Sequence, residues 1–136
     1  MSKIGSEVTA LKGILKSWAS SVRRKEIDGV LANHAKDILM FDVVPPLQLK
    51  GIEAYKASWV DLFFPWYGED GKFELSELNF SAGDSVAFAT GLIQCAGYEN
   101  NRRVEYTIRL TVCFEKRNGQ WTVVHEHHSE PVPAQK

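Results

Sequence analysis

The chain has 136 residues, of which 44% are apolar and 24% charged, as is ordinary for one soluble globular domain with its own hydrophobic core. Its 16 basic and 17 acidic residues leave a formal net charge of -1 and form no basic stripe, which argues against a nucleic-acid partner. No window approaches the roughly 20 apolar residues of a membrane span. The N-terminus lacks the apolar core of a signal peptide, so we expect a cytoplasmic protein without a membrane partner.

Apolar residues at helical spacing predict three helices in the first half of the chain. The first helix carries a stripe at steps of three and four, with Ser6 as its expected N-cap: Val8, Leu11, Leu15, Trp18 and Val22. A second, shorter helix is expected over residues 28–34 and an extended segment over residues 38–42, because the Pro45-Pro46 pair beyond excludes a helix. The third helix follows Gly51 and is expected to end before Pro65.

From Lys72 onward the apolar period changes to two, which is typical of strands. Four strands are expected, separated by short hairpin-type turns: residues 73–81, 86–97, 102–115 and 120–129. Helices followed by an antiparallel meander predict a single α+β domain over residues 1–136, with the helices on one face of the sheet. Cys95 and Cys113 lie in expected strands and form no CxxC motif, so we expect buried free thiols.

The last expected strand combines a tryptophan with three histidines. Strict alternation places His125, His127 and Ser129 on one face with Trp121, and the intervening residues on the other. Imidazoles two positions apart lie roughly 7 Å from each other, close enough to hold one ligand or ion. Three interpretations stay open, namely structural histidines, pocket histidines for hydrogen bonding or acid–base work, and a metal site. A metal needs further ligands that this face does not supply, so we expect no metal and no cofactor.

Arg109 lies in the middle of a long expected strand and is a candidate anion clamp, because guanidinium is a permanently charged bidentate donor. The alternative is a cross-strand salt bridge on an outer sheet face, for instance with Glu126. If Glu115 pairs with Trp121, Arg109 shares a face with the two odd-numbered histidines, whereas pairing with Gln120 places it beside Glu126. We favour the first register, which builds an arginine–histidine pocket.

Asp42 is the candidate general base. It follows Met40 and Phe41 and precedes valines and prolines, and a carboxyl in such surroundings suits acid–base chemistry. The alternative is an aspartate that binds loop N–H groups. Most aromatic residues are expected in the core, and those expected to contact a ligand are Trp18, Phe41, Trp59 and Phe63.

Several strings of the chain together resemble the SnoaL-like branch of the nuclear transport factor 2-like superfamily. They are His34-Ala35-Lys36-Asp37 leading to Phe41-Asp42 and Gly51, then Arg109-Leu110-Thr111, and finally Asn118-Gly119-Gln120-Trp121 through His127-His128-Ser129. The resemblance covers residues 6–130. The superfamily includes ketosteroid isomerase, polyketide cyclases and the association domain of calcium/calmodulin-dependent kinase II.

The resemblance implies a cone in which a curved sheet and helices enclose an apolar pocket, and a homodimer formed through the outer sheet face. Ketosteroid isomerase uses an aspartate base, whose place falls on Asp42, and an oxyanion hole made by a tyrosine and a protonated acid. The tyrosine's place falls on Trp18, and the acid's place offers only Leu110 or Thr111. Without a comparable oxyanion hole, steroid isomerisation is not expected.

The sequence therefore predicts a protein that binds a small apolar, carbonyl or carboxylate ligand. Our first hypothesis is an enzyme of proton-transfer chemistry, of the isomerase, cyclase or dehydratase type. Asp42 would be its base, and His125, His127 and Arg109 would bind or polarise the ligand beside Ser129. The alternative is a non-catalytic ligand-binding or oligomerisation module like the kinase association domain.

Overall fold

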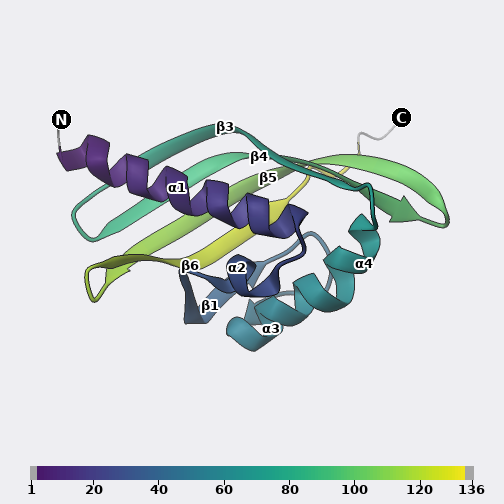
Figure 1. The fold of residues 1–136 in the computed structure, drawn as a ribbon, viewed down its shortest axis with the longest axis horizontal. Coiled ribbons are helices and arrows are strands. Elements are labelled where there is room, and N and C mark those ends of the chain that lie inside the picture. The colour runs from purple at the N-terminus through teal and green to yellow at the C-terminus, as the bar shows by residue number, and fades with distance from the viewer. Residues whose placement is uncertain (1–2, 134–136) are drawn as a thin grey trace.

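A long curved sheet has helices against one of its faces (Figure 1). The structure is a computed structural model that describes residues 3–133. Six strands form a mixed sheet in the order β2-β1-β6-β5-β4-β3. Their bounds are β1 His34–Phe41, β2 Leu49–Lys50, β3 Lys72–Ala82, β4 Val86–Glu99, β5 Arg102–Arg117 and β6 Gln120–Ser129. The predicted α+β class, with its four-strand meander β3 to β6, is confirmed.

The two later hairpins turn more tightly than predicted. Asn100 and Asn101 have φ of 53° and 64°, and Asn118 and Gly119 have φ of 52° and 76°. Positive φ at both central residues is the geometry of two-residue hairpin turns, which asparagine and glycine tolerate best. The flanking strands therefore extend to the turn residues themselves.

Two strands that the meander did not include complete the sheet. β1 pairs with β6 in parallel, and the short β2 pairs with β1 in antiparallel fashion at the edge. The expected helix over residues 28–34 is too long, because α2 (Ile27–Leu31) ends early and His34 already belongs to β1. Asn33, with φ of 62°, makes the left-handed step that lets the chain leave the helix.

The helices also begin and end at residues other than the predicted ones. α1 (Lys3–Arg23) begins before Ser6, which is therefore not its N-cap. The third predicted helix is a continuous run of α3 (Ile52–Ala57), the π-helical segment η1 (Ser58–Phe63) and α4 (Phe64–Tyr67). Pro65 does not end this run, because it lies in the first turn of α4, directly after the π-helical segment, and the helical residues continue to Tyr67. The run stops at Gly68, with φ of 67°.

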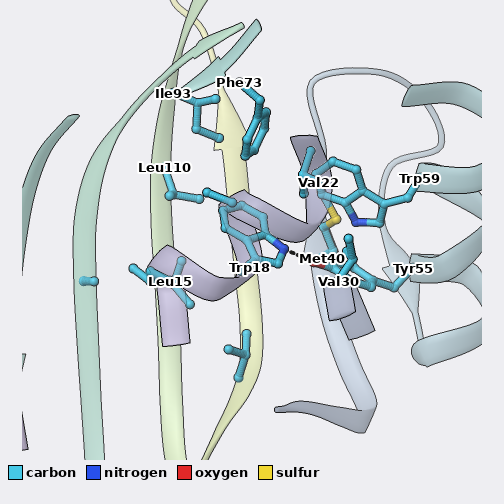
Figure 2. Close-up of a cluster of buried hydrophobic side chains, with 14 of the residues drawn as sticks. Leu15, Trp18, Val22, Val30, Met40, Tyr55, Trp59, Phe73, Ile93 and Leu110 are labelled. Atoms are coloured by element: carbon cyan, nitrogen blue, oxygen red, sulfur yellow. Dashed lines mark hydrogen bonds between the residues drawn. The ribbon is translucent and has the colours of Figure 1, made fainter. Parts of the chain in front are cut away.

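The core lies between α1, the η1–α4 segment and the inner face of the sheet. Figure 2 shows Leu15 and Trp18 packed towards Leu110, with Tyr55 and Trp59 on the opposite side of the cluster. The indole N–H of Trp18 donates to the hydroxyl of Tyr55 at 3.0 Å. This bond ties α1 to α3 through the interior, because both side chains are almost fully buried.

Cys95 and Cys113 are free thiols, as predicted; Cys95 is buried and Cys113 is half-buried. None of the helices between residues 3 and 133 combines the length and the apolar character needed to cross a membrane.

A β-bulge at Val124 interrupts the alternation of β6. Phe114 pairs with Val123, and Cys113 pairs with His125, so Val124 has no partner on β5. A bulge places two residues opposite one and leaves the extra residue unpaired. Every side chain beyond the bulge therefore lies on the face opposite to the one that strict alternation predicts.

The bulge overturns the predicted faces of β6. Trp121 shares the inner, helix-covered face with Glu126 and His128, all three of them buried. His125 and His127 lie on the outer face, where His127 is exposed. The expectation that these two histidines share a face with Trp121 is wrong, because alternation holds only within an uninterrupted ladder.

Neither predicted register of the last hairpin forms. Glu115 pairs with Thr122, because the turn has two residues, and beyond the bulge Arg109 pairs with Ser129. Arg109 does share a face with His125 and His127, as in the favoured register, but this is the outer face of the sheet.

Candidate functional site

A buried carboxylate is the centre of a polar network in the core. Glu126, whose side chain is 1% exposed, accepts hydrogen bonds at Oε2 from the Tyr55 hydroxyl (2.8 Å) and lies 2.7 Å from His34 Nε2. Its other oxygen, Oε1, lies 3.0 Å from His128 Nε2. One carboxylate from β6 thus joins side chains from β1, α3 and β6.

His34 lies between two hydrogen-bond acceptors. Its Nδ1 lies 2.8 Å from the Ala32 carbonyl, and its Nε2 lies against Glu126. Both ring nitrogens therefore face acceptors, and these two contacts fix the orientation of the ring. The pair is a buried ion pair supported by the Tyr55 hydroxyl, 3.1 Å from Nε2.

The two histidines decide the charge of Glu126. Burial by itself raises the pKa of this carboxyl, but the hydrogen bonds and charges of His128 and His34 outweigh burial and lower the pKa from 4.5 to about 2. The pKa of Tyr55 is raised well above 10.0, by burial first and then by the charge of Glu126 and its hydrogen bond to it. Tyr55 therefore stays a neutral donor while Glu126 stays ionised.

A cavity of about 550 Å³ opens beside this network. Its wall comes from the loop after β1, from η1 and α4, and from the ends of β4, β5 and β6: Asp42, Val43, Val44, Pro45, Ser58, Leu62, Phe63, Trp66, Cys95, Glu99, Tyr106, Ile108 and Glu130. Trp66 reaches the wall because Gly97 has no side chain; a Cβ there would come within 2.3 Å of the indole. The π-helical η1, a rare geometry often found at functional sites, supplies three of the wall residues.

Asp42 connects the cavity to the buried network. Its Oδ1 accepts the Val43 N–H at 2.7 Å and lies 4.0 Å from His128 Nδ1. The His128 side chain is 7% exposed, and no hydrogen bond reaches its Nδ1 from the described residues. A line of ionisable groups thus runs from the cavity wall into the core: Asp42, His128, Glu126 and His34. The contacts inside the core are of hydrogen-bond length, whereas Asp42 and His128, 4.0 Å apart, interact through charge without a direct hydrogen bond.

The other predicted ligand groups on β5 and β6 do not line the cavity. Arg109 Nε donates to Ser129 Oγ at 3.2 Å on the outer face. The Phe41 ring packs against His125 and His127 there, with ring centroids 4.8 and 5.3 Å away. These five side chains form a separate surface, divided from Asp42 by the thickness of the sheet.

The predicted aromatic contacts divide between core and cavity. Phe63 lines the cavity, whereas Trp18 and Trp59 belong to the core, 2% and 3% exposed. Both indoles flank His128, with ring centroids 6.2 and 6.5 Å from the imidazole. They therefore pack against His128 in the core and do not line the cavity.

The sequence profile of the SnoaL-like domain matches residues 11–134, which is almost the whole chain. The chain belongs to the SnoaL-like domain family. The resemblance inferred from the sequence is thereby confirmed. No curated protein matches the sequence.

Solved structures support the SnoaL-like assignment. An NTF2-like protein of unknown function from Pseudomonas putida KT2440 is 32% identical, over 93% of this chain and 88% of the other, with a TM-score of 0.83. A proposed dehydratase of the NTF2-like family from Streptomyces avermitilis has a TM-score of 0.82 at 12% identity, over 96% of this chain and 100% of the other. A proposed calcium/calmodulin-dependent protein kinase II association domain from Xanthomonas campestris has a TM-score of 0.75 at 19% identity, over 94% and 88%. The last two share the fold alone.

The buried network of this SnoaL-like domain was missed because alternation was assumed to be unbroken along β6. One signal could have revealed it, since the adjacent apolar residues Val123 and Val124 break the period of two just before the histidines. Nothing local marks His34 or Tyr55 as partners of Glu126, because they lie 92 and 71 residues away in the chain. Within residues 3–133, no group of three or more His, Cys, Asp and Glu side chains is arranged to hold a metal ion.

Proposed function

We propose that this SnoaL-like domain is a small-molecule enzyme that performs proton-transfer chemistry of the isomerase, cyclase or dehydratase type on a largely apolar carbonyl compound. The observation that carries the proposal is the Asp42 carboxylate, which lies in the wall of a cavity of about 550 Å³ and faces the buried His128 imidazole at 4.0 Å. A carboxylate that lies between a buried imidazole and a largely apolar cavity is suited to general base and acid catalysis.

Asp42 is the proposed catalytic base. An apolar substrate in the cavity brings a C–H bond next to its carbonyl to the carboxylate, which removes the proton and returns it at another carbon or to a leaving hydroxyl. His128 is the proposed positioning residue, because Glu126 holds its Nε2 at 3.0 Å and so directs Nδ1 towards Asp42. The role that the sequence suggested for His125 and His127 passes to His128, the histidine on the cavity side of the sheet.

The test is the exchange of α-protons of apolar ketones, such as phenylacetone and tetralone, followed in heavy water by NMR. This readout detects proton abstraction whatever the final product. We expect the protein to accelerate exchange, and Asp42→Asn to lower the rate at least about a hundredfold because the base is lost. His128→Asn should retain part of the activity and shift its pH profile, since it removes a neighbour of the base rather than the base.

The matched control is Asp28→Asn, the same substitution at an exposed residue of α2 that does not line the cavity. Its exchange rate should equal that of the unmodified protein. Exchange that survives Asp42→Asn unchanged would contradict the proposal. Tight ligand binding without any exchange would favour the alternative, a non-catalytic binding module.

We also propose a homodimer formed through the outer face of the sheet. Phe88 and Val86 lie on this face of β4 and are 49% and 59% exposed. Large exposed apolar side chains on one sheet face are typical of an interface. Light scattering should give the mass of a dimer for the unmodified chain and of a monomer for Phe88→Asp. The control Leu47→Asp, in an exposed loop, should remain dimeric; a monomeric unmodified chain would refute the interface.

A further inference from the structure

The cavity wall is negatively charged. Asp42, Glu99 and Glu130 contribute three carboxyl groups, and the described residues that line the cavity include no lysine, arginine or histidine. Arg109, the cation that the sequence offered for an anionic ligand, lies on the opposite face of the sheet and bonds Ser129. A carboxylate ligand would therefore enter a site without a counter-charge.

Glu99 holds two aromatic rings at the cavity. The indole N–H of Trp66 donates to its Oε2 at 3.0 Å, and the hydroxyl of Tyr106 donates to its Oε1 at 3.0 Å. The ring centroids are 6.2 Å apart with an interplanar angle of 32°. Both donors are neutral, so these two hydrogen bonds leave the negative charge of Glu99 in place beside two electron-rich rings. Aromatic faces next to a carboxylate are the chemistry that recognises ammonium groups.

The carboxylates contribute to raised pKa values at two neighbouring wall groups. Burial and then the charge of Glu130 raise the pKa of the Cys95 thiol to about 11. The pKa of Tyr106 is raised by its hydrogen bond to Glu99, by burial, and by the charges of Glu99 and Glu130. The contributions of Glu99 and Glu130 disfavour a further negative charge at the wall and favour a cation, whereas burial disfavours a charge of either sign.

The inner part of the same cavity wall is apolar and suits the hydrocarbon part of a ligand. Phe63, Cys95 and Ile108 face the cavity, while His128 presents a buried Nδ1 that no described residue bonds, 4.0 Å behind Asp42 Oδ1. A ligand that fills the chamber therefore meets apolar groups along its body, an acid–base pair at one point, and carboxylates with aromatic rings at another.

We propose that the ligand of this cavity is an organic cation, an apolar molecule that carries a protonated or quaternary ammonium group bound between Glu99, Glu130 and the rings of Trp66 and Tyr106. This inference rests on the proposed function, since it names the substrate class of the same cavity. In place of the expected neutral or carboxylate ligand, the charge of the wall selects an amine.

The test compares three probes of matched shape by titration calorimetry on the full chain: phenylpropylammonium, phenylpropanol and phenylpropionate. We expect the ammonium probe to bind roughly tenfold more tightly than the alcohol, and phenylpropionate to bind most weakly. Glu99→Gln and Glu130→Gln should each reduce the preference for the cation about threefold, because each removes one charge and keeps a side chain of the same length.

The matched control is Glu105→Gln, which removes the same charge from β5 one residue from Tyr106, where the side chain is 63% exposed and pairs with Arg103. It should leave the preference unchanged. Failure of the ammonium probe to bind, equal or tighter binding of the alcohol or the carboxylate, or a preference that persists in both glutamine variants would overturn the inference. A cation preference in a protein that exchanges no α-protons would refute the proposed catalysis and leave the charge selection standing.

Discussion

Replacing Glu126 with glutamine is expected to lower the free energy of unfolding by about 3 kcal/mol, because removing one partner of a buried ion pair leaves the other charge uncompensated. His34 would keep both ring nitrogens in the core, with Ala32 as its one remaining strong acceptor. In the unmodified protein, three groups share the two oxygens of the carboxylate: Tyr55, His34 and His128. The amide of glutamine has only one oxygen to accept from them. Urea denaturation measures the change.

Glu105→Gln is the control for this loss as well, since its exposed side chain predicts a change within about 0.5 kcal/mol. Tyr55→Phe gives a second view of the network, because it removes one donor to Glu126 and leaves the Trp18 N–H without its acceptor. We expect a loss of about 1–3 kcal/mol for this variant. A Glu126→Gln protein as stable as the Glu105→Gln control would show that the network contributes nothing to the fold.

Acidification is expected to remove the contribution of Glu126 between about pH 4.5 and pH 2. The folded-state pKa lies below the ordinary value, so the unfolded chain binds a proton first as the pH falls, and stability is lost on the acid side. The stabilisation is fully present above about 4.5 and disappears as the pH falls through about 2. A shift of this size corresponds to about 3 kcal/mol, measurable as a fall in the urea midpoint across the acid range.

Glu126→Gln separates the acid-dependent stability change caused by Glu126 from the changes caused by other carboxyl groups. One of these is the exposed Asp37, whose pKa is lowered by its hydrogen bond to Arg117 and by the charge of that residue. The variant keeps Asp37 and loses only the buried titration. Its stability should vary much less over the same range, so the two curves converge towards pH 2. Parallel curves would mean that Glu126 does not titrate with a lowered pKa.

Local pattern was sufficient for most of the fold. The spacing of Leu11, Leu15 and Trp18 predicted α1, and the period of two from Lys72 predicted the meander, because both patterns record which side of an element is buried. Element ends were less predictable. Pro65 looked like the end of a helix and lies in the first turn of the next one.

The candidate site was only partly predictable. Asp42 and Phe63 were placed at a pocket from sequence, and both line the cavity. His128 was assigned to the wrong face, because the alternation rule does not foresee a bulge at Val124. Glu99 and Tyr106, whose hydrogen bond shapes the cavity, carried no local signal at all.

By itself the sequence determined the α+β class, the free cysteines, the family and the candidate base Asp42. The tertiary structure alone decided that β1 adds in parallel to β6 and that one unpaired valine turns Glu126 and His128 inward. It also placed Arg109 away from the cavity and left carboxylates there instead. The physical reason is that periodicity reports burial over a few neighbouring residues. Register, bulges and ion pairs such as that between His34 and Glu126 depend on free energies gained between segments far apart in the chain.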